Sequence, residues 1–229
     1  MRAKLKKDFH MSLNDYSPYR PVYIYFHFHC MEYPESKVRL IRATLDLLSQ
    51  SGLSGVGINQ VVTQSATPKG SLYHFFPGGK LELAAVALEE AERFEGQWFR
   101  DIFQKRESVS RKVEQLFADA AHNLEASGFT RGCPVAAVTL ELSGDSESLR
   151  SVCRAIFMTW QDIIAAGLEE VPDAERLEVA ELILGTLEGA LIFSRAEATK
   201  DALLRSGRIL GDMLGRKYLA SGEGVDSPH

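Results

Sequence analysis

Two short helix-forming segments separated by only two residues constrain the fold of this chain more than any other feature. The segments run from Ile58 to Ser65 and from Pro68 to Phe75. The residues between them, Ala66 and Thr67, leave room only for a sharp turn, which is the spacing of a helix-turn-helix. The sequence therefore predicts a pair of crossed helices, the second of them short and close to the surface.

The second of these helices has a predicted start and a predicted exposed face. A hydroxyl at the N-cap accepts a free backbone N–H, and proline fits the first helical position, which suits Thr67 and Pro68 to these two places. Leu72 and Phe75 would anchor the helix to a core. The remaining side chains are polar or aromatic and are suited to the major groove of DNA: Lys69, Ser71, Tyr73 and His74.

Around these residues the chain resembles the TetR family of transcriptional regulators. The run PKGSLYHFF, followed by PGGK at 77–80, is similar to the recognition helix and the start of the next helix in the LmrA/YxaF-type branch. The run RGCPVAAV at 131–138 is similar to a segment of that branch's ligand-binding domain. The resemblance extends from about Pro34 to Leu219. Many relatives have glycine where this chain has Ala66. Because alanine disfavours positive φ, we expect a turn without positive φ there.

This resemblance implies an all-α fold of two domains. Residues 35–95 would form a three-helix N-terminal helix-turn-helix DNA-binding domain, and residues 96–219 a helical ligand-binding and dimerisation domain. The implied function is a dimeric DNA-binding repressor that a small hydrophobic or aromatic effector releases from a palindromic operator. Its partners would be double-stranded DNA, the effector and a second copy of the chain, with no cofactor, metal or membrane. The residues expected to contact DNA are Asn59, Gln60, Thr63, Thr67, Lys69, Gly70, Ser71, Tyr73, His74 and Lys80.

The distribution of charge supports this assignment, although the net charge of the chain is −5. Residues 36–80 carry a net charge of +4 and residues 1–35 a net charge of +1, so the chain after Lys80 carries −10. A basic N-terminal region on an acidic body is the electrostatic layout of a DNA-binding protein with a separate sensing domain. The alternative is that these charges are scattered over a soluble surface without a nucleic-acid partner.

The PGGK turn at 77–80 has an alternative interpretation as a nucleotide-binding phosphate loop. A Walker motif needs glycine about five residues before its Gly-Lys pair and serine or threonine after it, whereas this chain has His74 and Leu81. We therefore expect the helix start at Lys80 to contact one DNA phosphate. The sequence contains no catalytic motif, so an enzyme is a weak alternative. The other alternative is a helical protein-interaction module without DNA binding.

Apolar periodicity and breaks at glycine or proline predict further helices. Their expected ranges are Ser36–Gln50, Lys80–Gln104, Ser108–Ser127, Pro134–Leu142, Ser146–Glu169, Ala174–Ala196 and Thr199–Leu219. The family resemblance implies that a ligand shifts the helix at 80–104. This shift would change the separation of the two DNA-binding domains in a dimer.

The expected helix at 174–196 is apolar around most of its circumference, which requires burial on two sides. One side can face the chain's own core and the other a second subunit, with Gly185 and Gly189 allowing close approach. In the family the last two helices form a four-helix dimer interface. The residues we expect there are Leu184, Gly185, Gly189, Ile192 and Met213. A helix buried inside a monomer is the alternative.

Aromatic side chains are more numerous in the expected C-terminal domain than a tightly packed helical bundle of this size needs. The resemblance implies a ligand cavity there, suited to a flat or hydrophobic molecule. Its expected lining is Phe94, Trp98, Phe103, Phe117, Cys133, Phe157 and Trp160. Ordinary core packing is the alternative for each of these residues taken singly.

The three cysteines, Cys30, Cys133 and Cys153, form no CxxC pair and leave one thiol over. This usage argues against a disulfide framework and favours a reducing, cytoplasmic compartment. Cys133 precedes an expected helix start and follows Arg131. A helix N-terminus and a nearby cation both lower the pKa of a thiol. It is therefore a candidate redox sensor, with a role as a small apolar filler as the alternative.

The first 34 residues are an expected N-terminal extension, disordered or not native, outside the family pattern. Their aromatic run VYIYFHFHC is too short to span a bilayer, and the extension lacks the layout of a secretory signal. We hypothesise that the native start is Met31. His27, His29 and Cys30 lack a fourth ligand at a recognised spacing, which argues against a metal site. Residues 220–229 are expected to form a frayed tail.

Overall fold

A computed structural model describes residues 33–142 and 147–219, and within these ranges every regular element is a helix. This confirms the predicted all-α fold. The elements are α2 (Glu35–Ser51), α3 (Ile58–Ser65), α4 (Lys69–Phe75), α5 (Lys80–Phe103), α6 (Val109–Ala126), α7 (Pro134–Glu141), α8 (Glu147–Ala166), η2 (Asp173–Glu175), α9 (Arg176–Glu197) and α10 (Asp201–Leu219). The N-terminal extension, including the hypothesised start at Met31, and the tail at 220–229 lie outside the described residues.

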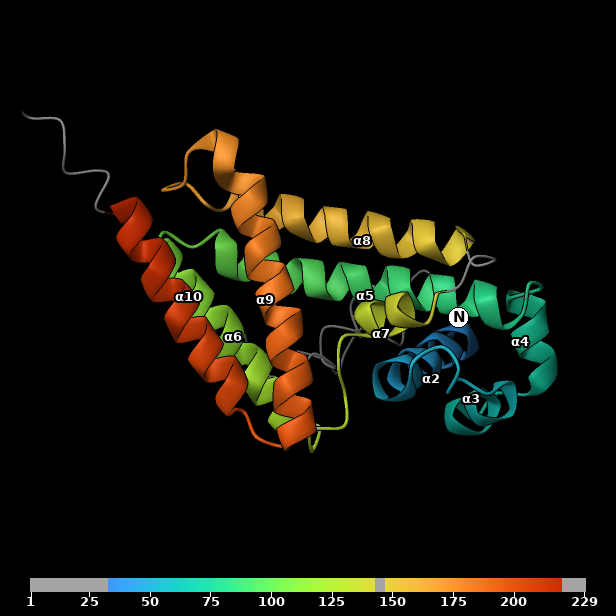
Figure 1. The fold of residues 1–229 in the computed structure, drawn as a ribbon. Helices are drawn as coiled ribbons and strands as arrows, with labels where there is room; N and C mark the ends of the chain where they lie inside the picture. The colour runs from blue at the N-terminus through green and yellow to red at the C-terminus, as the bar shows by residue number, and fades with distance from the viewer. Residues whose placement is uncertain (1–32, 143–146, 220–229) are drawn as a thin grey trace, which may run out of the picture.

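The helices α2, α3 and α4 form a small core with the first half of α5, and we call this group the head (Figure 1). Its fully buried residues are Leu40, Ile41 and Leu48 from α2, Val61 from α3, Leu72 from α4, and Leu83 and Leu88 from α5. The helix α3 has 8 residues and α4 has 7, too few to be stable in isolation. The predicted helix-turn-helix is therefore present, and its position depends on one buried apolar side chain in each short helix.

The helix α5 connects the head to the remaining helices, which we call the body. Its first half packs on α2, and its second half runs beside α8 (Figure 1). Aromatic side chains fill the interface with α8, where the fully buried Trp160 lies edge-on to Phe99. The Trp160 indole N–H donates to the carbonyl of Glu92 at 3.4 Å. One continuous helix thus extends from the head deep into the body.

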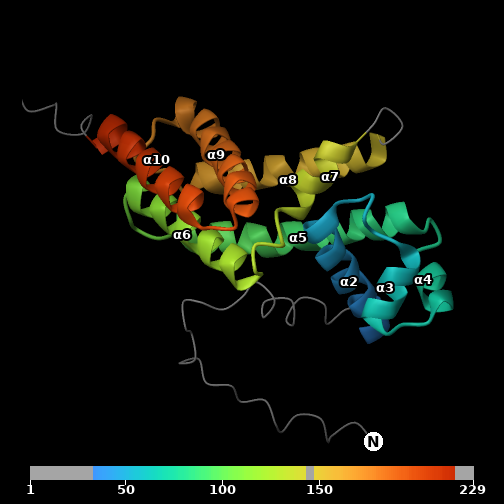
Figure 2. The same ribbon diagram turned by 60° about the horizontal axis from the view of Figure 1, so that its bottom comes forward.

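The helices α6, α9 and α10 pack together in the body, and α10 lies along α6 (Figure 2). Gly207 permits this close approach, because a Cβ added there would lie 2.5 Å from the Cβ of Phe117. At the start of α6, the buried Lys112 donates from Nζ to the carbonyl of Gly167 at 2.8 Å. This bond fastens α6 to the segment that follows α8.

The connection between α8 and α9 differs from the sequence prediction. The helix α8 ends at Ala166 rather than Glu169, because Gly167 begins a series of turns that leads to the buried Val171. The short 3-10 turn η2 follows, so α9 begins at Arg176, later than predicted. The Arg176 Nε donates to the Val171 carbonyl at 2.9 Å, which holds this connection in place.

Large apolar side chains are exposed on both α9 and α10. Among them are Leu182, Ile192 and Phe193 on α9, and Leu204, Ile209 and Met213 on α10. We call these six residues the apolar patch. Within residues 33–142 and 147–219, none of the helices is both long and apolar enough to cross a membrane.

Candidate DNA-binding surface and ligand cavity

The exposed side of α4 carries the polar residues expected from the sequence. Its exposed residues are Lys69, Gly70, Tyr73 and His74, with Ser71 half-buried. Tyr73 is a large aromatic residue and still retains 48% of its accessible surface. On the opposite side Leu72 is fully buried and Phe75 is half-buried, so the predicted anchors hold the helix with its polar side outward.

The helix α3 adds a second row of polar side chains beside α4. Asn59, Gln60 and Thr63 are all exposed. The Nζ of Lys69 lies 3.5 Å from the Oδ1 of Asn59, so the first turns of the two helices meet. The two rows therefore form one continuous region, which we call the α3–α4 surface.

The turn between α3 and α4 differs from the prediction in its backbone. Ala66 adopts the left-handed conformation, with φ 49° and ψ 41°, so the expectation of a turn without positive φ was wrong. The Ala66 N–H donates to the Thr63 carbonyl at 3.2 Å, and the Thr67 N–H donates to the Val62 carbonyl at 3.3 Å. These two bonds close the end of α3. The left-handed conformation costs a non-glycine residue about 1–2 kcal/mol, which the packing of the head must outweigh.

Thr67 does not have the roles that the sequence suggested. Pro68 is the N-cap residue of α4, and no side chain caps the helix. The Thr67 side chain is buried, and its hydroxyl donates to the Ser65 carbonyl at 3.1 Å. Thr67 therefore closes the turn from the inside, and its hydroxyl is not placed to contact a DNA phosphate.

Basic residues next to the α3–α4 surface also support the local fold. Arg39 of α2 donates from Nε to the Ser65 carbonyl at 3.0 Å and so holds the end of α3 against α2. At the start of α5, the Gly78 N–H donates to the carboxylate of Glu82 at 2.7 Å, which uses one of the donors available to a phosphate. Lys80 is half-buried beside this turn. The Gly78 N–H is therefore not free for a phosphate, and the Lys80 ammonium lies beside it.

Two family models match the chain, one over the head and one over the body. The model of the bacterial regulatory proteins of the tetR family matches residues 40–87. The model of the C-terminal domain of LmrA/YxaF-like transcriptional regulators matches residues 110–209. The chain belongs to the TetR family. It is a DNA-binding transcriptional regulator and not an enzyme.

Individual TetR-family proteins are similar over most of the chain. The transcriptional regulator LmrA of Bacillus subtilis is 26% identical over 188 residues, which are 81% of this chain and 100% of the relative. YxaF of the same organism is 28% identical over 172 residues, 74% of this chain and 90% of the relative. The regulatory protein TetR from Rhodobacter sphaeroides superimposes with a TM-score of 0.70 at 25% identity, over 76% of this chain and 96% of that one. CifR in complex with 26-base-pair operator DNA shares the fold, with a TM-score of 0.67 at 19% identity over 76% and 94% of the two chains.

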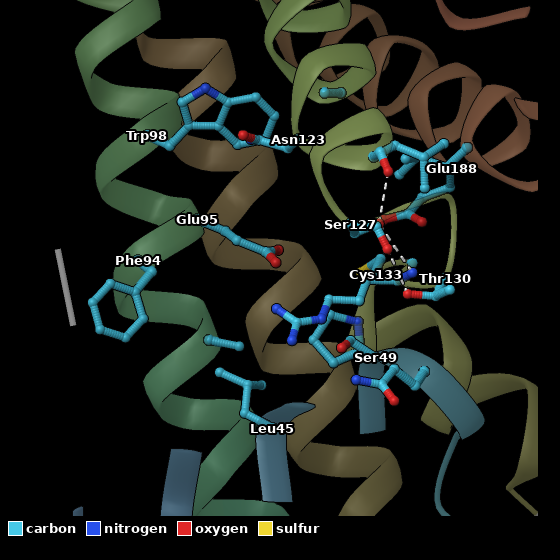
Figure 3. A pocket seen from close by; sticks show the side chains of 18 of the residues that line it. Leu45, Ser49, Phe94, Glu95, Trp98, Asn123, Ser127, Thr130, Cys133 and Glu188 are labelled. Carbon is cyan, nitrogen blue, oxygen red and sulfur yellow. Dashed lines mark hydrogen bonds between the residues drawn. The ribbon is translucent and has the colours of Figure 1, made fainter. Parts of the chain in front are cut away.

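The body of this TetR-family regulator contains a cavity of about 450 Å³. Its walls come from α2, α5, α6 and α9 and from the segment at 130–134 (Figure 3). Phe94, Trp98 and Cys133 line it, as the sequence predicted. A volume of this size lies within the range of small-molecule sites.

Four aromatic and apolar positions predicted for the cavity wall lie elsewhere: Phe103, Phe117, Phe157 and Trp160. Phe103, Phe117 and Trp160 are fully buried among the helices of the body. Phe157 packs edge-on to Trp160, with 5.6 Å between the ring centroids. This part of the prediction was wrong because these rings fill the helix interfaces instead of bordering the empty space.

Two carboxylates in the cavity wall were not expected from the sequence, Glu95 of α5 and Glu188 of α9. In Figure 3, Glu95 extends from α5 toward the segment that carries Cys133, and Glu188 approaches from the far side. Burial and repulsion by Glu188 raise the pKa of Glu95 to about 8. Burial raises the pKa of Glu188 to about 7. For Glu95 the helical face was a usable signal, because it lies one turn from the predicted cavity residue Trp98.

The surroundings of Cys133 are the opposite of those expected for a reactive thiol. Burial and the negative charges of Glu188 and Glu95 raise the pKa of Cys133 well above its usual value. Its Sγ accepts the Ala136 N–H at 3.4 Å and so caps α7. Arg131, which was expected to lower this pKa, lies 3.8 Å from the carboxylate of Asp46. The thiol is therefore neutral at physiological pH, and a redox-sensing role is not supported.

The cavity shares part of its wall with the head, through Leu45, Asp46, Ser49 and Gln50 of α2. Asp46 lies between the two parts of the molecule: it pairs with Arg131 of the body and accepts a bond from the Gln64 Nε2 of α3 at 3.3 Å. The Gly132 N–H donates to the Ser49 carbonyl at 2.9 Å, and Arg195 of α9 donates to the Gln50 carbonyl at 2.5 Å. The body therefore holds the C-terminal part of α2 next to the cavity.

The residues expected at a dimer interface are mostly exposed in the single chain. Ile192 and Met213 retain 59% and 61% of their accessible surface. Around Gly185 and Gly189 there is open space where a side chain would be. Leu184 differs, because only 5% of its surface is exposed and it packs into the core of its own chain. The prediction of Leu184 as a contact residue was wrong.

Proposed function

We propose that this regulator is a homodimeric repressor that binds a palindromic operator and leaves it when a small aromatic or hydrophobic effector occupies the cavity. The observation that carries the proposal is that the cavity is lined by α2, which packs on α3 and α4, and by α5, which packs on α2. A ligand-responsive repressor requires such a connection, because the two sites must influence each other's free energy of binding.

The α3–α4 surface is the proposed contact with DNA. The helix α4 would enter the major groove, which is wide enough for one helix. No atom lies within 4 Å of the position that a Cβ of Gly70 would take, so the backbone of α4 can approach the DNA closely. Thr63 and Lys80 are proposed contacts to phosphates. The other proposed contacts, to bases or backbone, come from Asn59, Gln60, Lys69, Gly70, Ser71, Tyr73 and His74.

The apolar patch is the proposed dimer contact. A contiguous exposed apolar region on a soluble protein often marks a surface for another protein. The open space at Gly185 and Gly189 would allow a helix of the second subunit to approach α9. Dimerisation also serves DNA binding, because two copies of α4 would then meet half-sites about one helical turn of DNA apart.

The effector would act on the head by two connected routes. The helix α5 runs from the cavity into the head, so a shift of α5 tilts the head. Arg131 in the cavity wall pairs with Asp46, which is bonded to Gln64 of α3. Either route changes the separation of the two α4 helices in a dimer. Release follows only if the effector binds more tightly to the arrangement that does not fit the operator.

The proposal can be tested with DNA that flanks the protein's own coding region. We expect sedimentation velocity to show a dimer, and a footprint to show two half-sites about one DNA turn apart. The exposed Lys69 would be replaced by alanine, with the exposed Lys105→Ala as a control of equal charge. Loss of binding in the Lys69 variant alone supports the α3–α4 surface. A monomer without affinity for any DNA would contradict the proposal and favour a protein-interaction module.

A further inference from the structure

We infer that the effector is a cation, with a protonated amine held between Glu95 and Glu188 and an aromatic body packed against Phe94 and Trp98. This inference rests on the proposed function and adds to it the chemical class of the ligand. It departs from the sequence-based expectation, which described the effector only as flat or hydrophobic. The reasons lie in the charge balance of the cavity, the surroundings of its two glutamates and the position of its aromatic rings.

Acidic side chains outnumber basic ones in the cavity wall. The acidic residues are Asp46, Glu95 and Glu188, and the basic residue is Arg131. The Arg131 guanidinium lies 3.8 Å from the Asp46 carboxylate, so these two charges compensate each other. Glu95 and Glu188 are left as an acidic pair on opposite walls, one on α5 and one on α9 (Figure 3).

Neither glutamate of this pair has a basic partner within residues 33–142 and 147–219. Glu188 is hydrogen-bonded to the Cys133 thiol, which is neutral. Glu95 is half-buried in the cavity wall, where burial and repulsion by Glu188 raise its pKa. Ionising a carboxyl group there without a counter-charge costs both its desolvation and the repulsion. A bound cation would relieve both costs at once.

The rest of the cavity wall suits the apolar part of such a ligand. Phe94 and Trp98 come from the same turns of α5 as Glu95. The indole N–H of Trp98 donates to the Asp119 carboxylate at 3.3 Å, and Asp119 does not line the cavity. The polar group of Trp98 is thus satisfied outside the cavity, and its ring remains as an apolar wall. An aromatic ring also attracts a nearby cation through its π-electrons.

Other ligand classes fit these walls less well. A neutral aromatic molecule would fill the space but provide no counter-charge against which Glu95 and Glu188 could ionise. An anion would face both carboxylates, because Arg131 is already paired with Asp46. The cavity should therefore discriminate by charge among molecules of the same size and shape.

The test uses three indole compounds that share a ring system and differ in charge. These are tryptamine, a cation, tryptophol, which is neutral, and indolepropionate, an anion. Calorimetric titration of the DNA-free protein should show tryptamine binding about tenfold or more tightly than the other two, as expected for a charge-assisted contact. Cation binding should also release on the order of one proton, seen as a dependence of the heat on the buffer, because the glutamates ionise when the amine binds.

Paired variants assign this preference to the two glutamates. Glu95→Gln combined with Glu188→Gln should lower the affinity for tryptamine by about tenfold or more and leave tryptophol unaffected. Glu89→Gln is the control, because Glu89 is an exposed carboxylate on α5 that does not line the cavity. Circular dichroism of each variant confirms that it is folded.

Three outcomes would overturn the inference: equal or weaker binding of tryptamine than of tryptophol, a cation preference that survives the double substitution, or no binding of any of the three. Each of these is distinct from failure of the proposed function. That function fails if the protein has no affinity for DNA or if no cavity ligand alters that affinity. A repressor released by neutral compounds alone would keep the proposed function and refute the cationic effector.

Discussion

Replacement of Glu95 by glutamine should stabilise the ligand-free protein at alkaline pH. Burial and the Glu188 charge raise the pKa of Glu95 from 4.5 to about 8. Each pKa unit corresponds to about 1.36 kcal/mol. The shift of Glu95 therefore means that its ionised form lowers the free energy of unfolding by at most about 5 kcal/mol. Structural relaxation and water entering the cavity reduce this value, so we expect Glu95→Gln to raise the free energy of unfolding by about 2–3 kcal/mol at pH near 8.5.

The effect has a defined pH window. Between the unfolded pKa of 4.5 and the folded pKa of about 8, the folded protein keeps a proton on Glu95 that the unfolded chain has lost. The stability of the wild-type protein therefore falls as pH rises through this range and levels off above it. At a pH of about 5, wild-type Glu95 is already neutral when folded, so the glutamine variant should differ by less than about 1 kcal/mol.

Urea unfolding followed by far-ultraviolet circular dichroism across this range measures the effect. Protein concentration is held constant, because dimerisation would change the apparent stability. Glu89→Gln on the exposed side of α5 is the control and should follow the wild-type curve. Asp46, whose pKa burial raises to about 6, titrates in both proteins and cancels in the difference. If the wild-type and Glu95→Gln curves remain parallel between pH values of about 5 and 8.5, the account of an uncompensated carboxylate is wrong.

Four further predictions concern the head, the connection and the dimer. Lys69→Ala should weaken operator binding by about 1–3 kcal/mol in fluorescence anisotropy, and an equal loss on all DNA sequences would identify a backbone contact. Ala66→Gly should raise the free energy of unfolding by about 0.5–1 kcal/mol in urea, because glycine tolerates positive φ; Ala198→Gly, at φ 52°, should behave alike. Asp46→Asn should preserve operator binding but reduce its release by tryptamine, and unchanged release would exclude this route. Phe193→Asp should give monomers in sedimentation and lose operator affinity; an intact dimer would remove the apolar patch as the interface.

The head was predictable because its constraints are local in the sequence. Two residues between two helix-forming segments allow one arrangement, and the apolar positions Val61 and Leu72 determine which sides are buried. The failures in this region concern the backbone of the turn. Ala66 takes a conformation that disfavours alanine, since the burial of its neighbours fixes the turn more strongly than the preference of one residue. Thr67 is buried by the same turn.

The body was predictable as a set of helices but not as a cavity. Whether an aromatic ring fills an interface or borders empty space depends on how helices far apart in the sequence cross. Trp98 and Trp160 therefore could not be distinguished from their spacing, although one lines the cavity and the other is fully buried. The same holds at the proposed dimer face, where Leu182 is exposed and Leu184 buried, because two residues along a helix correspond to opposite sides.

The placement of the uncompensated charge has a consequence for regulation. Glu95 lies on the helix that runs from the cavity into the head, and Asp46 lies on the helix that supports α3. Ionisation of Glu95 and Glu188 therefore destabilises the ligand-free protein at the place where a bound cation would be most favourable. A cation bound beside Glu95 alters the operator affinity only under one condition. The position of the head that fits the operator and the position that does not must leave different space around Glu95. A ligand that fits both positions equally well would bind tightly, stabilise the fold and leave the regulator on its DNA.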